Sequence, residues 1–142
     1  MTNHVHAHYP EAFLVEVDGS SSAGPTESVL NVTHWEFVFG NSDSTFGTII
    51  ASVDLPRRAV TIKTESGVWV GSTPMPEFPT MSPVDAEKLL RKAGYTQSFK
   101  FVTLRQPNVA EPVPYPLFIF GPLDGAGYVG VDTVTDAVVP IH

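Results

Sequence analysis

The sequence predicts an α+β protein built from two related units of antiparallel β-sheet, with a helix packed on one face. Three observations carry this prediction. The 13 prolines and 11 glycines among the 142 residues are spread along the chain, which favours short strands and turns over long helices. One segment has clear helical spacing, whereas several others alternate apolar with polar residues. Short matches between the first and second halves indicate an internal repeat.

The predicted helix spans residues 83–93. Ser82 is a favourable N-cap residue, and Pro83 suits the first helical position because the N–H that it lacks would have no partner within the helix. We expect Gly94 to end the helix in the left-handed conformation. The apolar residues of the segment recur at helical spacing and form one face, which consists of Ala86, Leu89, Leu90 and Ala93.

The other regular segments are predicted to be strands. In residues 34–39, the side chains of Trp35, Phe37 and Phe39 alternate onto one face, as expected for a half-buried strand. Residues 54–58 separate two further strands and are predicted to form a hairpin turn. The remaining predicted strands are residues 13–17, 48–53, 59–63, 68–70, 99–104, 117–120, 128–131 and 137–141.

Three short matches recur in the same order in both halves of the chain. Their offsets are 86, 81 and 78 residues, which we attribute to loops of different length. Strands share composition, so each match alone is weak, and the three in order favour a duplicated unit. The matches join Ala7-x-Tyr9-x-x-x-Phe13 to Ala93-x-Tyr95-x-x-x-Phe99, Phe37-Val38-Phe39-Gly40 to Phe118-Ile119-Phe120-Gly121, and Val53-Asp54 to Val131-Asp132.

The repeat divides the chain into a first unit at residues 1–70, a proline-rich connector at residues 71–82 and a second unit at residues 83–142. The helix of the first unit would fall before Tyr9, where it would be short or missing. Four phenylalanines at equivalent positions are expected to form the two cores: Phe37, Phe39, Phe118 and Phe120.

The second unit resembles the PepSY-type module. The resemblance rests on the helix with Leu89 and Leu90, on the strands that follow it and on a closing hairpin at residues 128–138. Asp136 stands in that hairpin where a glycine is usual, and aspartate tolerates the left-handed turn conformation. A tandem of such units is also similar in architecture to the beta-lactamase inhibitor proteins. Both resemblances imply a binding or inhibitory module of the cell envelope or the extracellular space, and neither supplies a catalytic residue.

Charge and composition exclude several classes of function. The net charge is −7, and all eight Lys and Arg residues lie between Arg57 and Arg105, so we expect no nucleic-acid binding. The chain has no cysteine, which excludes disulfides, thiolate metal sites and a cysteine nucleophile. No apolar stretch is long enough for a transmembrane helix. The first ten residues do not form a signal peptide, so the compartment stays open: periplasmic or secreted if a signal has been removed, otherwise cytoplasmic.

Three candidate sites for chemistry have simpler explanations. His4, His6 and His8 would share a face on a strand and could hold zinc or copper, but the segment contributes no carboxylate and lies at a chain end. Asp54 and Asp132 could act as general acid and base, yet their repeated position favours two hairpin turns in which each accepts backbone N–H bonds. His34 could act as a base, but no serine-nucleophile motif accompanies it.

The aromatic and apolar residues near the prolines are the more informative candidates. Trp69, Met75, Phe78 and Tyr115 lie in or beside proline-rich segments and are predicted to form a partner-binding surface. The alternative is that they fold back onto a sheet face. The sequence therefore predicts a non-enzymatic protein-binding or inhibitory module without metal or cofactor, and the alternative function is a small-ligand or lipid-binding domain with a cavity between helix and sheet.

Overall fold

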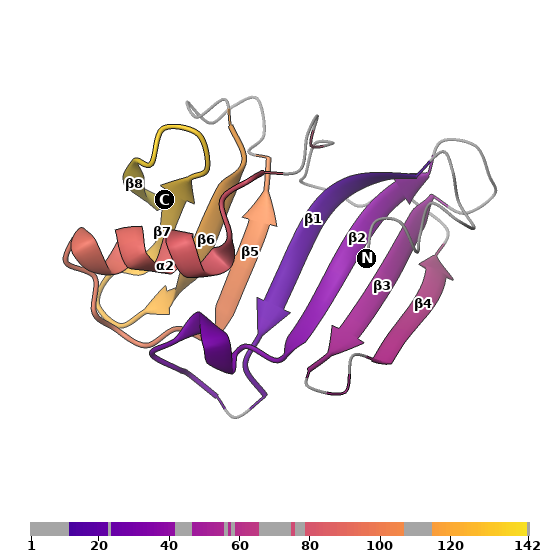
Figure 1. The fold of residues 1–142 in the computed structure, drawn as a ribbon, viewed down its shortest axis with the longest axis horizontal. Helices are drawn as coiled ribbons and strands as arrows, with labels where there is room; N and C mark the ends of the chain where they lie inside the picture. Colours follow the sequence, from indigo (N-terminus) through magenta and orange to yellow (C-terminus); the bar gives the residue numbers. More distant parts are fainter. Residues whose placement is uncertain are drawn as a thin grey trace.

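The computed structural model describes residues 12–22, 24–41, 47–55, 57, 59–65, 75, 79–106 and 115–141. Eight strands form one antiparallel sheet in the order β4-β3-β2-β1-β5-β6-β7-β8 (Figure 1). The strands are β1 (Ala12–Ser20), β2 (His34–Asn41), β3 (Thr48–Asp54), β4 (Ala59–Glu65), β5 (Phe101–Arg105), β6 (Leu117–Leu123), β7 (Gly127–Asp132) and β8 (Val138–Ile141).

The two halves of the sheet are joined directly, because β1 pairs with β5. Strands β1–β4 and strands β5–β8 each follow one another from neighbour to neighbour, so each half is a four-stranded meander. The prediction of an α+β protein with antiparallel sheet is confirmed. The sheet is continuous, and Val17 pairs with Leu104 across the joint; the origin of its two halves as related units stays a prediction.

Helix α2 (Pro83–Lys92) crosses one face of the β5–β8 half (Figure 1). The Oγ atom of Ser82 accepts a hydrogen bond from the backbone N–H of Asp85 at 3.1 Å, as predicted for the N-cap. Ala93 is the C-cap residue, and Gly94 follows with a φ of 100°. The predicted helix is therefore confirmed. The helix that we expected before Tyr9 lies outside the described residues.

A short 3-10 helix, η1 (Val29–Asn31), connects the first half of the chain to α2. The carboxylate of Glu87 accepts a hydrogen bond from the backbone N–H of Val29 at 2.8 Å. One guanidinium nitrogen of Arg91 donates to the carbonyl of Glu27 at 2.8 Å, and the other donates to the carbonyls of Tyr95 and Gln97. Two neighbouring turns of α2 thus hold the segment between β1 and β2.

The predicted strand at residues 99–104 begins two residues late, at Phe101. Phe99 forms an isolated bridge with Thr26 instead, with backbone hydrogen bonds of 2.8 Å in both directions. Its ring is fully buried and meets the ring of Phe120 edge to face, with centroids 5.2 Å apart. This bridge is a further contact between the segment that follows β1 and the segment between α2 and β5.

Most buried apolar residues of the described chain form one core between α2 and the sheet, where we expected two, while Val38, Ile50 and Leu117 are buried outside that cluster. Leu90 and Ala86 of the helix are fully buried there. The sheet contributes residues from both halves because the joint between β1 and β5 makes them continuous, among them Val17, Phe39, Ile49, Leu104, Phe118, Phe120, Val129 and Val131. Phe37 is only partly buried against this core.

The last hairpin confirms two predictions about its turn residues. Asp136 has a φ of 64°, as its left-handed position in the last hairpin requires. The carboxylate of Asp132 accepts hydrogen bonds from the backbone N–H groups of Val134 and Thr135, as predicted. Asp54 is the last residue of β3, directly before the predicted turn, and its carboxylate bonds to the ring of His34 on the neighbouring strand; that it also accepts backbone N–H bonds in the turn stays a prediction.

Candidate functional site

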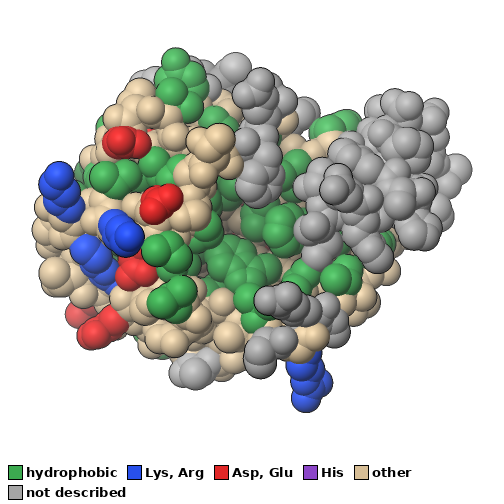
Figure 2. Space-filling model, in the orientation of Figure 1, with side chains coloured by type: hydrophobic (Ala, Val, Ile, Leu, Met, Phe, Trp, Pro, Cys, Tyr) green, Lys and Arg blue, Asp and Glu red, His purple; other side chains and the backbone are tan. Residues whose placement is uncertain are grey.

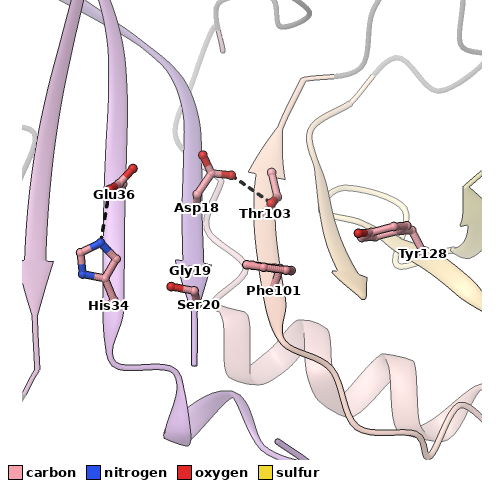
Figure 3. Close-up of a pocket in the computed structure, with 8 residues that line it drawn as sticks. All are labelled: Asp18, Gly19, Ser20, His34, Glu36, Phe101, Thr103 and Tyr128. Atoms are coloured by element: carbon pink, nitrogen blue, oxygen red, sulfur yellow. Dashed lines mark hydrogen bonds and ion pairs between the residues drawn. The ribbon is translucent and has the colours of Figure 1, made fainter. Parts of the chain in front are cut away.

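The sheet has two faces with different chemistry, which we call the α2 face and the opposite face. Side chains alternate along each strand, so Val17 and Leu104 lie in the core on the α2 face. Their neighbours Asp18 and Thr103 belong to the opposite face, where Figure 3 shows them with α2 behind the sheet. The opposite face therefore carries the titratable residues of the central strands.

A hollow of about 360 Å³ lies on the opposite face over the joint between the two halves. Four strands contribute to it: β1, β2, β5 and β7 (Figure 3). Its polar and aromatic side chains come from segments that are far apart in the sequence and adjacent in the sheet. We call it the polar hollow; it is lined by Asp18, Gly19, Ser20, His34, Glu36, Phe101, Thr103 and Tyr128.

His34 lies between two carboxylates on this face. Its Nδ1 atom is 2.7 Å from an oxygen of Asp54, which is its register partner on β3. Its Nε2 atom is 3.3 Å from an oxygen of Glu36, two residues along β2. The hydrogen bond to Asp54 and then that to Glu36 raise the pKa of the imidazole above its ordinary value. When the ring is protonated, it partly neutralises both carboxylates.

Asp18 occupies the middle of the polar hollow. Thr103 on β5 donates a hydrogen bond from Oγ1 to the Asp18 carboxyl at 2.9 Å. Burial, followed by the hydrogen bond and the negative charge of Glu16, raises the pKa of Asp18 from 3.8 to about 8. Glu36 adds to this effect through its charge. Asp18 therefore holds its proton at neutral pH.

Ser20, His34 and Asp54 are register partners on three adjacent strands, in the order of a nucleophile, a base and an orienting carboxylate. A serine is activated only when the neutral imidazole has a nitrogen free to accept its proton. Here Nε2 lies 3.3 Å from a carboxylate oxygen of Glu36, and the raised pKa favours the protonated ring over the neutral one. The geometry favours an ion-paired histidine over a catalytic triad.

The α2 face carries a second depression, an apolar groove of about 610 Å³. It lies between the β1–β4 half of the sheet and residues 79–83 before the helix, and Figure 2 shows hydrophobic side chains gathered in it. No charged residue lines it within the described chain. The lining includes Val17, Trp35, Phe37, Val53, Leu55, Val60, Met81, Leu104 and Phe118.

Of the four predicted partner-binding residues, the structure describes Met75 and Tyr115, and neither lines the polar hollow or the apolar groove. Met75 is buried, with 8% of its surface exposed, and its backbone N–H donates to the carbonyl of Leu14 at 3.0 Å. It thus folds onto the sheet, the alternative that the sequence left open. Tyr115 is exposed just before β6. Trp69 and Phe78 lie outside the described residues, as does the predicted strand at residues 68–70.

The proposed metal ligands His4, His6 and His8 also lie outside the described residues. Within the described chain, no group of three His, Asp or Glu side chains has the arrangement of a metal site. Asp54 and Asp132 cannot act together as acid and base, since the four strands β2, β1, β5 and β6 separate β3 from β7. Among the described helices, none has the length and apolar character needed to cross a membrane.

The sequence did not identify the polar hollow because its members are joined only by strand pairing. Asp54, for example, is predicted from the sequence to be a turn residue. The usable signal was the alternation of acids with apolar residues in β1, where Glu16 and Asp18 flank Val17. That pattern predicts an acidic strand face, but it does not reveal that β5 lies beside it.

The chain matches no protein-family model, no curated protein and no solved structure. The resemblance to a PepSY-type tandem stays a prediction, and the site is interpreted from its own residues.

Proposed function

We propose that the chain is a non-enzymatic binding module that engages another protein through the opposite face of its sheet. The observation that carries this proposal is the exposure of large aromatic side chains around the polar hollow. Phe101 and Tyr128 line the hollow and are 40% and 44% exposed. Exposed aromatic residues beside polar groups are typical of protein interfaces, where they supply most of the binding free energy.

Phe13 extends this aromatic surface along β1. It pairs with Gly40 on β2, and a Cβ atom on Gly40 would lie 2.5 Å from its ring. Gly121 on β6 has a similar neighbour, since a Cβ there would lie 2.5 Å from the Tyr128 ring. Glycines thus let these rings lie flat against the sheet, which leaves the other side of each ring for a partner.

The experiment compares capture by three immobilised baits in an extract of the source cells. They are the wild type, a Phe101→Ser/Tyr128→Ser variant, and a Leu30→Ser/Val134→Ser control that removes exposed apolar side chains elsewhere. We expect a protein that is retained by the wild type and the control and lost from the hollow variant. Equal retention by all three baits would contradict a partner site on this face.

The non-enzymatic part of the proposal has its own test. A fluorophosphonate probe labels a serine only when a neighbouring base activates it. We expect no labelling of Ser20, because His34 is held by Asp54 and Glu36. Mass spectrometry that locates the probe on Ser20 would show a reactive triad and overturn this part.

The apolar groove supports a second candidate function, the binding of a small apolar ligand such as an acyl chain. Its volume lies within the range of about 300–1,000 Å³ that is usual for small-molecule sites. Calorimetric titration with dodecanoate tests it, with Val53→Glu placing a charge in the groove and Ser52→Glu as the control on the opposite face. We expect binding that Val53→Glu abolishes and Ser52→Glu preserves; no binding to the wild type would reject this candidate.

We also propose that the two meanders arose by duplication, as the PepSY-like reading implies. Strand registry supports this proposal: Phe13 pairs with Gly40 in one half, and Phe101 pairs with Gly121 in the other. The glycines are those of the repeated Phe-x-Phe-Gly sequence. This registry relates Phe13 to Phe101, two residues away from the match with Phe99 that the sequence suggested.

A further inference from the structure

We propose that the polar hollow receives the cationic side chain of an arginine or lysine from the partner protein. This inference rests on the function proposed above and names the chemistry that the partner presents. It draws on the charge of the hollow, on its aromatic walls and on its size.

The hollow carries more acidic than basic groups. Asp18 and Glu36 line it, Glu16 lies two residues from Asp18 on β1, and Asp54 faces His34 from β3. Asp18, whose pKa is about 8, adds its negative charge once the pH exceeds that value. Within the described chain, the ion pairs of Glu36 and Asp54 are both made with the single cation His34. Asp18 receives a hydrogen bond from the neutral Thr103. A cation entering between Asp18 and Glu36 would meet both carboxyl groups.

The nearest basic residues of the chain occupy other positions. Arg105 is the register partner of Glu16, two pairs along from Asp18 and Thr103. The ammonium group of Lys100 lies over the ring of Phe101, 5.5 Å from its centroid. The contact shows that this ring accepts a cation on its face. Since Lys100 is exposed, a partner cation that also reaches the carboxylate of Glu36 and the carboxyl group of Asp18 can compete with it.

The size and shape of the hollow limit what can enter. A volume of about 360 Å³ is small for a folded element, and the aromatic rings of Phe101 and Tyr128 stand on one side of it (Figure 3). A long side chain that ends in a cation can contact both sides of the hollow. Its stem packs on the aromatic rings, while its charged end approaches the carboxyl groups. Charge complementarity therefore selects a basic segment over an acidic or apolar one.

The first experiment titrates the isotope-labelled protein with N-acetyl-argininamide, followed by amide NMR shifts at pH 8.5 and constant ionic strength. The neutral isostere N-acetyl-citrullinamide is the control ligand. We expect saturable shifts at Asp18, Thr103 and Tyr128 with argininamide alone. Equal shifts with both ligands, or shifts spread evenly over all surface acids, would overturn the proposal.

Matched variants test the carboxylates. Asp18→Asn/Glu36→Gln keeps side-chain size and hydrogen-bonding atoms, and we expect it to weaken argininamide binding by about tenfold. Asp85→Asn/Asp124→Asn removes two exposed acids elsewhere and should leave binding unchanged. Retained amide-shift dispersion shows that each variant is folded. Equal affinity of the two double variants would overturn the proposal.

The last arm separates this inference from the proposed function. Argininamide is added to the wild-type bait with its captured partner, and we expect release that citrullinamide does not cause. If the partner is retained by the aromatic residues but is not released by argininamide, the cation pocket is wrong and the binding module stands. If no partner is captured through this face while argininamide binds in the hollow, the proposed function is wrong and the pocket serves a free cation.

Discussion

The two faces of the sheet are built from the same strands, but near the joint they differ in burial and in chemistry. On the α2 face, alternate residues such as Val17 and Leu104 are buried in the core. On the opposite face, their neighbours Asp18 and Thr103 form part of a hollow with a histidine, further carboxylates and exposed rings. Near the joint, strand alternation separates buried core side chains from the polar side chains of the hollow, whereas farther out the opposite face also buries apolar residues such as Val38 and Leu117.

The largest effect should come from the core of the α2 face. Leu90→Ala removes a fully buried side chain and is expected to lower the free energy of unfolding by about 2–5 kcal/mol. Phe101→Ala on the opposite face should cost clearly less, since that ring is 40% exposed. Urea unfolding of both variants measures the contrast. Equal losses in the free energy of unfolding would show that both faces contribute equally to stability.

Two glycines sharpen the comparison. A Cβ on Gly19 would lie 2.6 Å from the Trp35 ring, which is held by a hydrogen bond from its indole N–H to the carbonyl of Val32 at 3.1 Å. A Cβ on Gly40 would meet the exposed ring of Phe13, which can swing into solvent. We expect Gly19→Ala to cost about 1–3 kcal/mol and Gly40→Ala less than about 1 kcal/mol in thermal or urea unfolding.

A pH-dependent effect is expected at Asp18. Its pKa is about 8 in the folded chain and near 3.8 in the unfolded chain, so the folded state binds this proton more tightly. The contribution of Asp18 to the free energy of unfolding is therefore greatest below about pH 4, and it is lost as the pH rises through about 8.

Asp18→Asn cannot ionise and should escape that loss. We expect a gain of about 1–2 kcal/mol over the wild type at pH 8.5, and little difference at pH 4. Urea unfolding at both pH values measures it. A constant difference between the two proteins at both pH values would contradict the role of the Asp18 proton.

The smallest effect should be seen at the exposed His34. Asp54→Asn removes the main cause of its raised pKa, and Glu36→Gln removes the second. We expect both variants to lower the pKa of the ring, Asp54→Asn the more strongly, with little change in stability because the group is exposed. An NMR titration of the ring protons measures both shifts. The raised pKa stabilises the fold below about pH 6.5, and that contribution fades as pH rises through the folded pKa.

Local signals predicted much of the fold. The cap Ser82, Pro83 and the stop at Gly94 define α2, and Asp136 marks a left-handed turn, because each depends on residues a few positions away. Alternation located most strands for the same reason.

Features that depend on distant pairing could not be predicted. The hydrogen bond from Thr103 to Asp18 joins residues 85 positions apart, and no local pattern places β5 beside β1. Asp54 has a turn-like sequence, yet strand registry sets it opposite His34. The sequence therefore indicated an acidic strand, while the site required the order of the strands.

The link between the chain after β1 and α2 has a consequence for affinity. Thr26 bridges Phe99, Glu27 bonds to Arg91, and Val29 bonds to Glu87, so the joint beneath the polar hollow is braced from behind. These contacts hold the two halves of the sheet rigidly together. The residues that line the polar hollow therefore keep their positions before a partner binds. Association then loses little conformational entropy in this chain, and tight binding becomes compatible with a small contact area.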